Sequence, residues 1–250
     1  MPILSIGSDP KTIKGQKRGY KTAIIYMAPA KNSGFNMCPM SRLAGCEAAC
    51  LYLAGRGGMT MIQNARLVRT ALFNTDQKKF MDTLIKELIA FIKSARKADF
   101  IPVVRLNGTS DIRYENIYLD GSKETIFTMF PDIQFYDYTK LVRRFYHILP
   151  KNYFLLLSYS EANDRYRRMC MEVLIKYPDI NLAVVADELD DPFLGRPVVS
   201  GDESDLRFLD PPGVVVRLKA KGPARKDTTG FVIREFGVGG DSGPSDWKLV

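Results

Sequence analysis

The sequence predicts an α/β fold: a partial or irregular β/α barrel, in which helices wrap a parallel sheet, with a C-terminal extension. Short apolar runs of strand length alternate with amphipathic segments of helical period. Polar residues collect just after several of these runs, where functional side chains gather in parallel β/α folds. The 250 residues, 46% of them hydrophobic, suffice for one large domain with a buried core.

The predicted elements begin after an irregular lead-in of residues 1–20, which is rich in Lys, Gly and Ser. The first predicted strand runs from Thr22 to Met27, a continuous apolar run typical of strands buried on both faces. A short helix is expected over Met61 to Thr70. The clearest helix follows it, because apolar residues recur at helical spacing while lysines occupy the other faces. Its apolar stripe is Phe80, Leu84, Leu88, Phe91, Ile92 and Ala95.

Four further strands are expected, and polar residues follow each of them. They are Ile101 to Leu106, Ile133 to Tyr136, Tyr153 to Leu157 and Leu182 to Val185. Helices are expected between them over Leu141 to Ile148 and Asn163 to Lys176. This alternation spans residues 21–190, which we assign to the β/α domain. Roughly five or six such units are too few for an eightfold barrel, so a partial one is predicted.

The character of the sequence changes after Asp190. Residues 191–236 begin with a turn-rich link and contain a predicted strand from Val214 to Leu218, so we expect a β-containing extension packed on the domain. Residues 237–250 are predicted to form a flexible tail, because Gly, Ser and Asp are frequent there.

Charge and hydropathy bear on partners and compartment. The net charge of +8 permits association with nucleic acid without establishing it, since the basic residues are spread along the chain. No apolar run is long enough to cross a bilayer, and residues 1–20 lack the apolar core of a signal peptide. We therefore expect a cytoplasmic protein without membrane association, in a compartment where thiols stay reduced.

Three of the four cysteines, Cys38, Cys46 and Cys50, follow the first predicted strand. Three thiols so close cannot all pair with one another, and a shared metal suits the short Cys46–Cys50 span better than a disulfide. They could hold three corners of an iron–sulfur cluster or three of four positions on zinc. Zinc ligands usually come in pairs two to four residues apart, whereas seven and then three residues separate these cysteines. We favour a [4Fe-4S] cluster; the alternative is three thiols merely packed in a loop.

A fourth protein ligand is not evident. Cys170 falls inside an amphipathic helix, and His147, the sole histidine, lies near an expected helix end. Both positions are more typical of packing or surface roles than of metal binding. Three thiolates on a four-iron cluster leave one iron free for substrate or cofactor.

The strand, the three-cysteine loop and the β/α units together resemble the radical S-adenosylmethionine superfamily. A closer resemblance, over about residues 20–235, is to the bacteriophage gene-product-eighty-eight family, which is largely uncharacterised. The segments that carry it are Asn36 to Pro39, Gly45 to Leu51, Ala65-Arg66 with Arg69-Thr70, Arg105 to Asp111, Phe135 to Lys140, and Gly201-Asp202 with Arg207 to Asp210. It implies a phage or mobile-element origin, and hence the cytoplasm of an infected bacterium, more firmly than a reaction.

The superfamily likeness implies an iron–sulfur enzyme that binds S-adenosylmethionine at the open iron and cleaves it to a carbon radical. The superfamily usually separates its cysteines by three and then two residues, and this chain departs from that spacing. The likeness implies the following roles: Asn107, Thr109 and Asp111 for the amino group of the cofactor, Arg105 for its carboxylate, Ser158 or Ser160 for its ribose, and Lys140 and Tyr138 for substrate contact or proton transfer. Ordinary hydrogen bonds at turns and strand ends are the alternative for each.

Two other functional classes compete with the enzyme. One is a metal-stabilised phage protein that binds nucleic acid without catalysis, favoured by Tyr and Arg within Arg143 to Tyr146 and Arg165 to Arg168. The other is a structural or host-interaction protein without metal. Asp202, Asp205, Arg207 and Asp210 alternate in sign, which favours a local ion-pair network over catalysis. No motif identifies the substrate.

Overall fold

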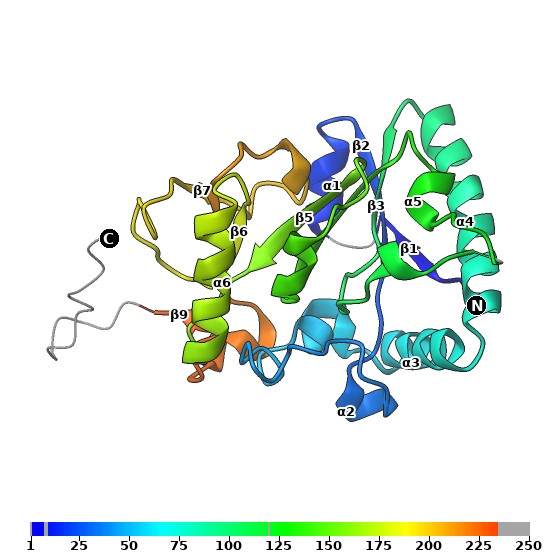
Figure 1. Ribbon diagram of the computed structural model, residues 1–250. Coiled ribbons are helices and arrows are strands. Elements are labelled where there is room, and N and C mark those ends of the chain that lie inside the picture. Colours follow the sequence, from blue (N-terminus) through cyan, green and yellow to red (C-terminus); the bar gives the residue numbers. More distant parts are fainter. Residues whose placement is uncertain (1, 8–9, 120, 235–250) are drawn as a thin grey trace, which may run out of the picture.

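The computed structural model describes residues 2–7, 10–119 and 121–234 (Figure 1). The predicted tail, residues 237–250, lies outside this part of the chain. Within it, nine strands form one sheet in the order β1-β2-β3-β4-β5-β6-β8-β7, with β9 paired to β6. The strands are β1 (Leu4–Ile6), β2 (Tyr20–Ile25), β3 (Ile101–Arg105), β4 (Gln134–Thr139), β5 (Tyr153–Ser158), β6 (Leu182–Ala186), β7 (Val198–Ser200), β8 (Val215–Leu218) and β9 (Val232–Ile233).

The sheet is parallel except at β1, which pairs antiparallel with β2. Strands β2 to β6 lie side by side in sequence order, so the predicted run of β/α units is confirmed. The predicted partial barrel is not observed, because the sheet is open: its edges are β1 and β7, which are not paired with each other. The antiparallel β1 occupies the free edge of β2, the edge that barrel closure would require.

Three long helices and three short ones accompany the sheet. They are α1 (Pro10–Gln16), α2 (Ala30–Ser33), α3 (Thr60–Thr75), α4 (Gln77–Lys97), α5 (Ile126–Met129) and α6 (Asp164–Lys176). Asp76 is the N-cap of α4, because its side chain accepts a hydrogen bond from the Lys79 amide. Asn163 caps α6 in the same way. None of the described helices is long and apolar enough to span a membrane.

The two faces of the sheet are covered differently. On one face, the predicted stripe of α4 packs against β2 to β5, and α6 packs against β5, β6 and β8. On the other face, Leu206 and Phe208 pack against Val103 and Tyr136, and α1 meets Leu206 through Gly15. The core is therefore two-sided, and a loop segment rather than a long helix closes its second side.

Several local predictions need correction. The lead-in of residues 1–20 is not irregular: it contains β1 and α1, and the Glu87 carboxylate accepts hydrogen bonds from the amides of Ile3 and Leu4. The helix expected over Leu141 to Ile148 is a 3₁₀ helix, η4 (Val142–Tyr146). The extension contributes β7, β8 and β9 to the same sheet. β8 confirms the strand predicted from Val214 to Leu218, whereas β7 and β9 are too short for periodicity to reveal.

Candidate functional site: a three-cysteine loop

The three cysteines lie on a segment of consecutive turns, residues 38–50, which we call the cysteine loop. Backbone hydrogen bonds hold its turns: the amide of Ala44 donates to the Met40 carbonyl at 2.9 Å, and that of Cys46 to the Ser41 carbonyl at 3.0 Å. The loop follows β2 and α2 and leads into the 3₁₀ helices η1 (Leu51–Leu53) and η2 (Gly55–Gly58). It therefore starts from the carboxyl edge of the parallel sheet, as predicted.

Side chains and backbone from other strand ends fix the loop in place. Past the end of β5, the Ser160 hydroxyl donates to the Ala44 carbonyl at 2.7 Å. Just before β9, the Thr229 hydroxyl donates to the Gly45 carbonyl at 3.3 Å. Past the end of β3, the Asp111 amide donates to the carbonyl of Met37 at 2.8 Å. Figure 1 shows the blue-to-cyan loop region close to the orange region that runs from the 3₁₀ helix η6 (Gly222–Lys226) to β9, below the sheet.

Gly45 has a specific structural reason to be glycine. Its φ is +70°, and a Cβ added there would stand 2.3 Å from the Ala162 Cβ and 3.0 Å from the Thr229 hydroxyl. Only glycine meets both conditions without strain. The loop consequently packs closely on the segment after β5, with Cys46 one residue beyond the contact.

The three thiols of the loop lie near one lysine. Cys38, Cys46 and Cys50 are free and half-buried, and all three interact electrostatically with the ammonium of Lys140, which is itself half-buried. Lys140 comes directly after β4, and its ammonium lies 5.5 Å from the centre of the Phe231 ring. The Cys38 sulfur stands 3.8 Å from the Thr109 carbonyl oxygen. Lys140 thus lies in the neighbourhood of the three residues predicted to bind metal.

The electrostatics of the site follow from burial. Burial, with a smaller contribution from Asp111, raises the pKa of Cys38 to about 12. Burial also raises the pKa of Cys46, although Lys140 opposes this shift. For Lys140 itself, burial acts to lower the pKa, but Cys46, Asp111 and the other thiols outweigh it and raise the pKa. A protonated Lys140 beside the protonated thiols of Cys38 and Cys46 is the result.

The three cysteine sulfurs do not form a site for a single metal ion. In the described residues, no group of three or more His, Cys, Asp and Glu side chains is arranged to hold a single metal ion. The sulfurs therefore do not converge on one point as zinc ligands do. Thiolates on an iron–sulfur cluster bind separate iron atoms and need not converge. Thiolates are the donors that such a cluster takes, and the fourth cysteine, Cys170, is buried elsewhere, in the core formed by α6.

Asp111 has a full set of partners in the structure. Its carboxylate accepts from the Thr139 hydroxyl and the Lys140 amide, both at 2.7 Å, and from Arg144 at 3.2 Å. The Nε and Nη2 atoms of Arg144 also donate hydrogen bonds to the Glu115 carboxylate, at 2.9 and 2.8 Å. This buried arrangement ties β4 to the segment after β3 and so sets the position of Lys140.

Asn107 and Thr109, predicted for the same amino group, are likewise engaged. The Asn107 side-chain oxygen accepts from Ser110 and from the Ile112 amide, and its nitrogen donates to the Ile112 carbonyl and to Asp137. The Thr109 hydroxyl bonds to both the amide and the carbonyl of Met27. These residues brace the strand ends that carry the cysteine loop.

Arg105 and Tyr138 form a separate group. Arg105 donates to Asp205 at 2.7 Å and lies over the Tyr138 ring at 5.0 Å, and the Tyr138 hydroxyl lies 3.5 Å from the same carboxylate. Burial, reinforced by Asp205, raises the pKa of Tyr138, so its hydroxyl stays protonated. The expected ion-pair network is partly local: Arg207 pairs with Asp210 at 3.2 Å, while Asp205 pairs with Arg105.

The two serines predicted for a ribose differ in position. Ser160 holds the cysteine loop through the Ala44 carbonyl. Ser158 is buried, and its carbonyl accepts from the Tyr166 hydroxyl at 2.6 Å. The structure therefore places Ser160 beside the cysteines and Ser158 under α6.

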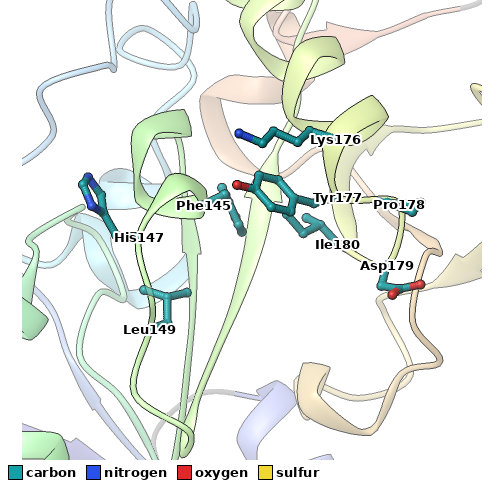
Figure 2. A pocket seen from close by; sticks show the side chains of 8 residues that line it. All are labelled: Phe145, His147, Leu149, Lys176, Tyr177, Pro178, Asp179 and Ile180. Carbon is teal, nitrogen blue, oxygen red and sulfur yellow. The ribbon is translucent and has the colours of Figure 1, made fainter.

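His147 lies in a separate groove (Figure 2). The groove measures about 510 Å³, and its walls come from the chain before β5 and from the end of α6. In Figure 2, Phe145 and Tyr177 lie between His147 and Lys176. The Lys176 ammonium lies 4.9 Å from the centre of the Tyr146 ring and 5.5 Å from that of Tyr177. This is an aromatic and basic surface rather than a metal site.

Sequence reasoning missed several residues that shape the site. Glu115 and Phe231 lie in segments without a distinctive pattern, and the segment of Arg144 was noted only for its Tyr and Arg residues. Only the folded chain brings the three side chains to the strand ends. Arg66 is buried beside the cysteine loop. A signal for Arg66 existed, since it belongs to one of the segments that carried the family resemblance.

Comparison with known proteins agrees with that resemblance. A family model described as Gene product 88 matches residues 3–235, which is most of the chain and includes the cysteine loop. No match was found to a curated protein or to a solved structure. The chain therefore belongs to the phage Gene product 88 family.

Proposed function

We propose that this protein is an iron–sulfur enzyme related in mechanism to the radical S-adenosylmethionine superfamily. Cys38, Cys46 and Cys50 would hold a [4Fe-4S] cluster, and S-adenosylmethionine or a substrate would bind at the open iron. The observation that carries the proposal is the gathering of three thiols from one anchored loop around Lys140. When bound, such a cluster supplies electrons and an iron with a vacant coordination position.

Charge balance around Lys140 supports the proposal. In the described part of the chain, no ion pair of the half-buried Lys140 ammonium with a carboxylate is recorded, although Asp111 and the thiols interact with it electrostatically. An ammonium that is shielded from water is costly unless negative charge lies close to it. Thiols that lose their protons on binding a cluster would add negative charge beside it. Lys140 would then neutralise the site and orient the Cys46 sulfur.

Preorganisation also supports it. The loop is held by Ser160, Thr229 and Asp111 from three different strand ends, and Cys46 packs next to a small apolar cluster that includes Ala49 and Phe231. Such anchoring keeps donor atoms in place before a metal binds and limits access of water. We assign Lys140 to the substrate side of the site; Tyr138 would act only on a substrate that reaches the Arg105–Asp205 pair.

The test is metal analysis of anaerobically purified protein with single Cys→Ser variants. We expect about four iron and four sulfide per chain in the wild type. Cys38→Ser, Cys46→Ser and Cys50→Ser should each lose most of the iron. Cys170→Ser is the matched control, because this thiol is buried in the α6 core, and it should retain the iron.

Electron paramagnetic resonance of the reduced protein tests the cofactor separately. A change of the cluster spectrum on addition of S-adenosylmethionine is expected, independently of any turnover. Protein that stays free of iron after reconstitution, or a Cys38→Ser/Cys46→Ser/Cys50→Ser variant that binds as much iron as wild type, would disprove the cluster.

The groove of Figure 2 favours a second candidate function, the binding of single-stranded nucleic acid. Tyr146 is 42% exposed and offers a ring on which a base could stack, and Lys176 beside it could meet a phosphate. Arg143 and Arg144 belong to the same 3₁₀ helix, although Arg144 is buried. This candidate needs no metal chemistry.

A further inference from the structure

Arg66 is a buried arginine next to the cysteine loop. It lies on α3, and only 6% of its surface is exposed. Its Nη1 donates to the Tyr52 carbonyl at 2.6 Å. The guanidinium carbon lies 4.9 Å from the centre of the Tyr26 ring and 5.2 Å from that of Tyr52. The cation is thus set between two aromatic walls at the carboxyl edge of the sheet.

One edge of this guanidinium has no acceptor. The Nε of Arg66 is buried without a hydrogen-bond partner, and among the described residues no hydrogen bond from Nη2 and no ion pair is recorded. In Arg144, by contrast, the Nε and Nη2 atoms donate hydrogen bonds to the two carboxylate oxygens of Glu115. Arg66 presents the same two donors without a carboxylate.

Other buried arginines have an anionic partner or two acceptors, although the Nε of Arg105 and that of Arg207 also lack a hydrogen-bond partner. Arg105 pairs with Asp205, Arg207 pairs with Asp210, and Arg69 donates to the carbonyls of Pro2 and Tyr26. A buried cation without an anionic partner costs free energy, and burial accordingly lowers the pKa of Arg66. An anion that binds here would remove this cost.

The surroundings suit a small anionic group. Cys50 is close enough to Arg66 to interact with it electrostatically, so the guanidinium lies near the three-cysteine site. The glycine-rich helix η2 lies against the guanidinium: a Cβ on Gly57 would stand 3.1 Å from Nη1 and 3.2 Å from Nη2. Gly57 thus presents backbone instead of a side chain to the guanidinium.

We propose that the Nε–Nη2 edge of Arg66 binds an oxyanion, the carboxylate or phosphate group of a small molecule, between η2 and Cys50. The planar fork of an arginine holds two oxygens of such a group at once. The site does not require iron, so it can be tested whether or not the cluster is present. In the assembled protein it would place an anionic substituent of the ligand beside the cysteines.

The test uses the full-length, metal-free, reduced protein, titrated with inorganic phosphate and, separately, with acetate. Ionic strength is held constant with chloride, and binding is followed by calorimetry and by the unfolding temperature. At least one of the two anions should raise the unfolding temperature of the wild type in a saturable manner. A response to phosphate alone assigns a phosphate ligand, and a response to acetate alone assigns a carboxylate ligand.

Variants locate the site. Arg66→Met should weaken anion binding at least tenfold, whereas Arg56→Met, which removes an exposed arginine of η2, should not change it. Arg66→Lys keeps the charge but loses the two-pronged edge, and it should bind several-fold more weakly than wild type. Without anion, Arg66→Met should unfold at the same or a higher temperature than wild type, because it removes an uncompensated buried charge.

The opposite results overturn the proposal. Absence of any saturable response in the wild type, or equal affinity in wild type and Arg66→Lys, rules out recognition by this edge. A marked fall in the unfolding temperature of anion-free Arg66→Met, with Arg66→Lys restoring it, would make Arg66 a brace for the Tyr52 carbonyl only.

Discussion

At the scale of single residues, most of the polar side chains that follow the strands are engaged with one another. Asp137 is the centre of one such set: it accepts from the Asn107 amide at 2.9 Å and from the Tyr153 hydroxyl at 3.0 Å. The predicted positions of these residues at strand ends are right, but sequence gives residue types and not partners. A carboxylate satisfied within the fold and one waiting for a ligand look the same in a sequence.

Asp137 gives a pH dependence with a definite sign. Burial, partly offset by Arg105, raises the pKa of Asp137 from 3.8 to about 6 in the folded protein. Between these values the folded state binds more protons than the unfolded state, so the contribution of Asp137 to the unfolding free energy falls as pH rises. About two pKa units correspond to about 3 kcal/mol over the window from pH 4 to 6.

Chemical denaturation of wild type and Asp137→Asn at several pH values measures this effect. The asparagine does not titrate, and the altered hydrogen bonds add an offset that is independent of pH. The unfolding free energy of wild type minus that of the variant should therefore decrease from pH 4 to pH 6. A difference that stays flat over this range would contradict a raised pKa.

At the scale of elements, periodicity predicted the long helices and the central strands well. The stripe of α4 and the cap at Asp76 could be predicted because helix packing and capping are local properties. β7 and β9 could not be predicted, because strands of three and two residues are too short for their hydrophobic pattern to differ from that of a turn. The open sheet was missed for a different reason: the pairing of β1 at the edge depends on contacts remote in sequence.

The cysteine loop offers a test at this scale. In Gly45→Ala, the added Cβ would stand 2.3 Å from the Ala162 Cβ, on a residue whose backbone is left-handed. We expect this variant to lower the unfolding free energy by about 1–3 kcal/mol. Because the clash is next to Cys46, the reaction of this thiol with a disulfide reagent should also become faster. Thermal unfolding and the rate of thiol modification are the two measurements.

Gly34→Ala is the matched control. Gly34 has a φ of +77° and nothing within 4 Å of an added Cβ, so only backbone strain is introduced. It should cost less free energy than Gly45→Ala and leave the Cys46 thiol unaffected. Equal effects of the two variants would show that close packing on Ala162 does not hold the loop.

At the scale of the whole molecule, the parallel sheet brings together what the sequence keeps apart. Lys140, Phe231 and the three cysteines come from segments up to almost 200 residues apart. They meet because β2 and β4 point the same way, and because β9, which follows Phe231, begins beside the last residues of β6. The cysteines could be predicted as one site from their spacing. Their lysine could be predicted only as a strand-end residue, because its approach to the thiols depends on the order of the strands.

The net charge of +8 is a property of the whole molecule, and it sharpens the choice between the two candidate functions. If the groove of Figure 2 binds single-stranded nucleic acid, affinity should fall steeply with salt, because phosphate contacts release counterions. Lys176→Gln should reduce the slope of log affinity against log salt by about one, and Tyr146→Ala should weaken binding of an oligonucleotide without changing that slope. Lys93→Gln, which lies on α4 and outside this groove, is the control for the loss of one positive charge. If Lys176→Gln and Lys93→Gln changed the affinity and its salt dependence equally, the whole basic surface would attract polyanions, and the groove would not be a nucleic-acid binding site.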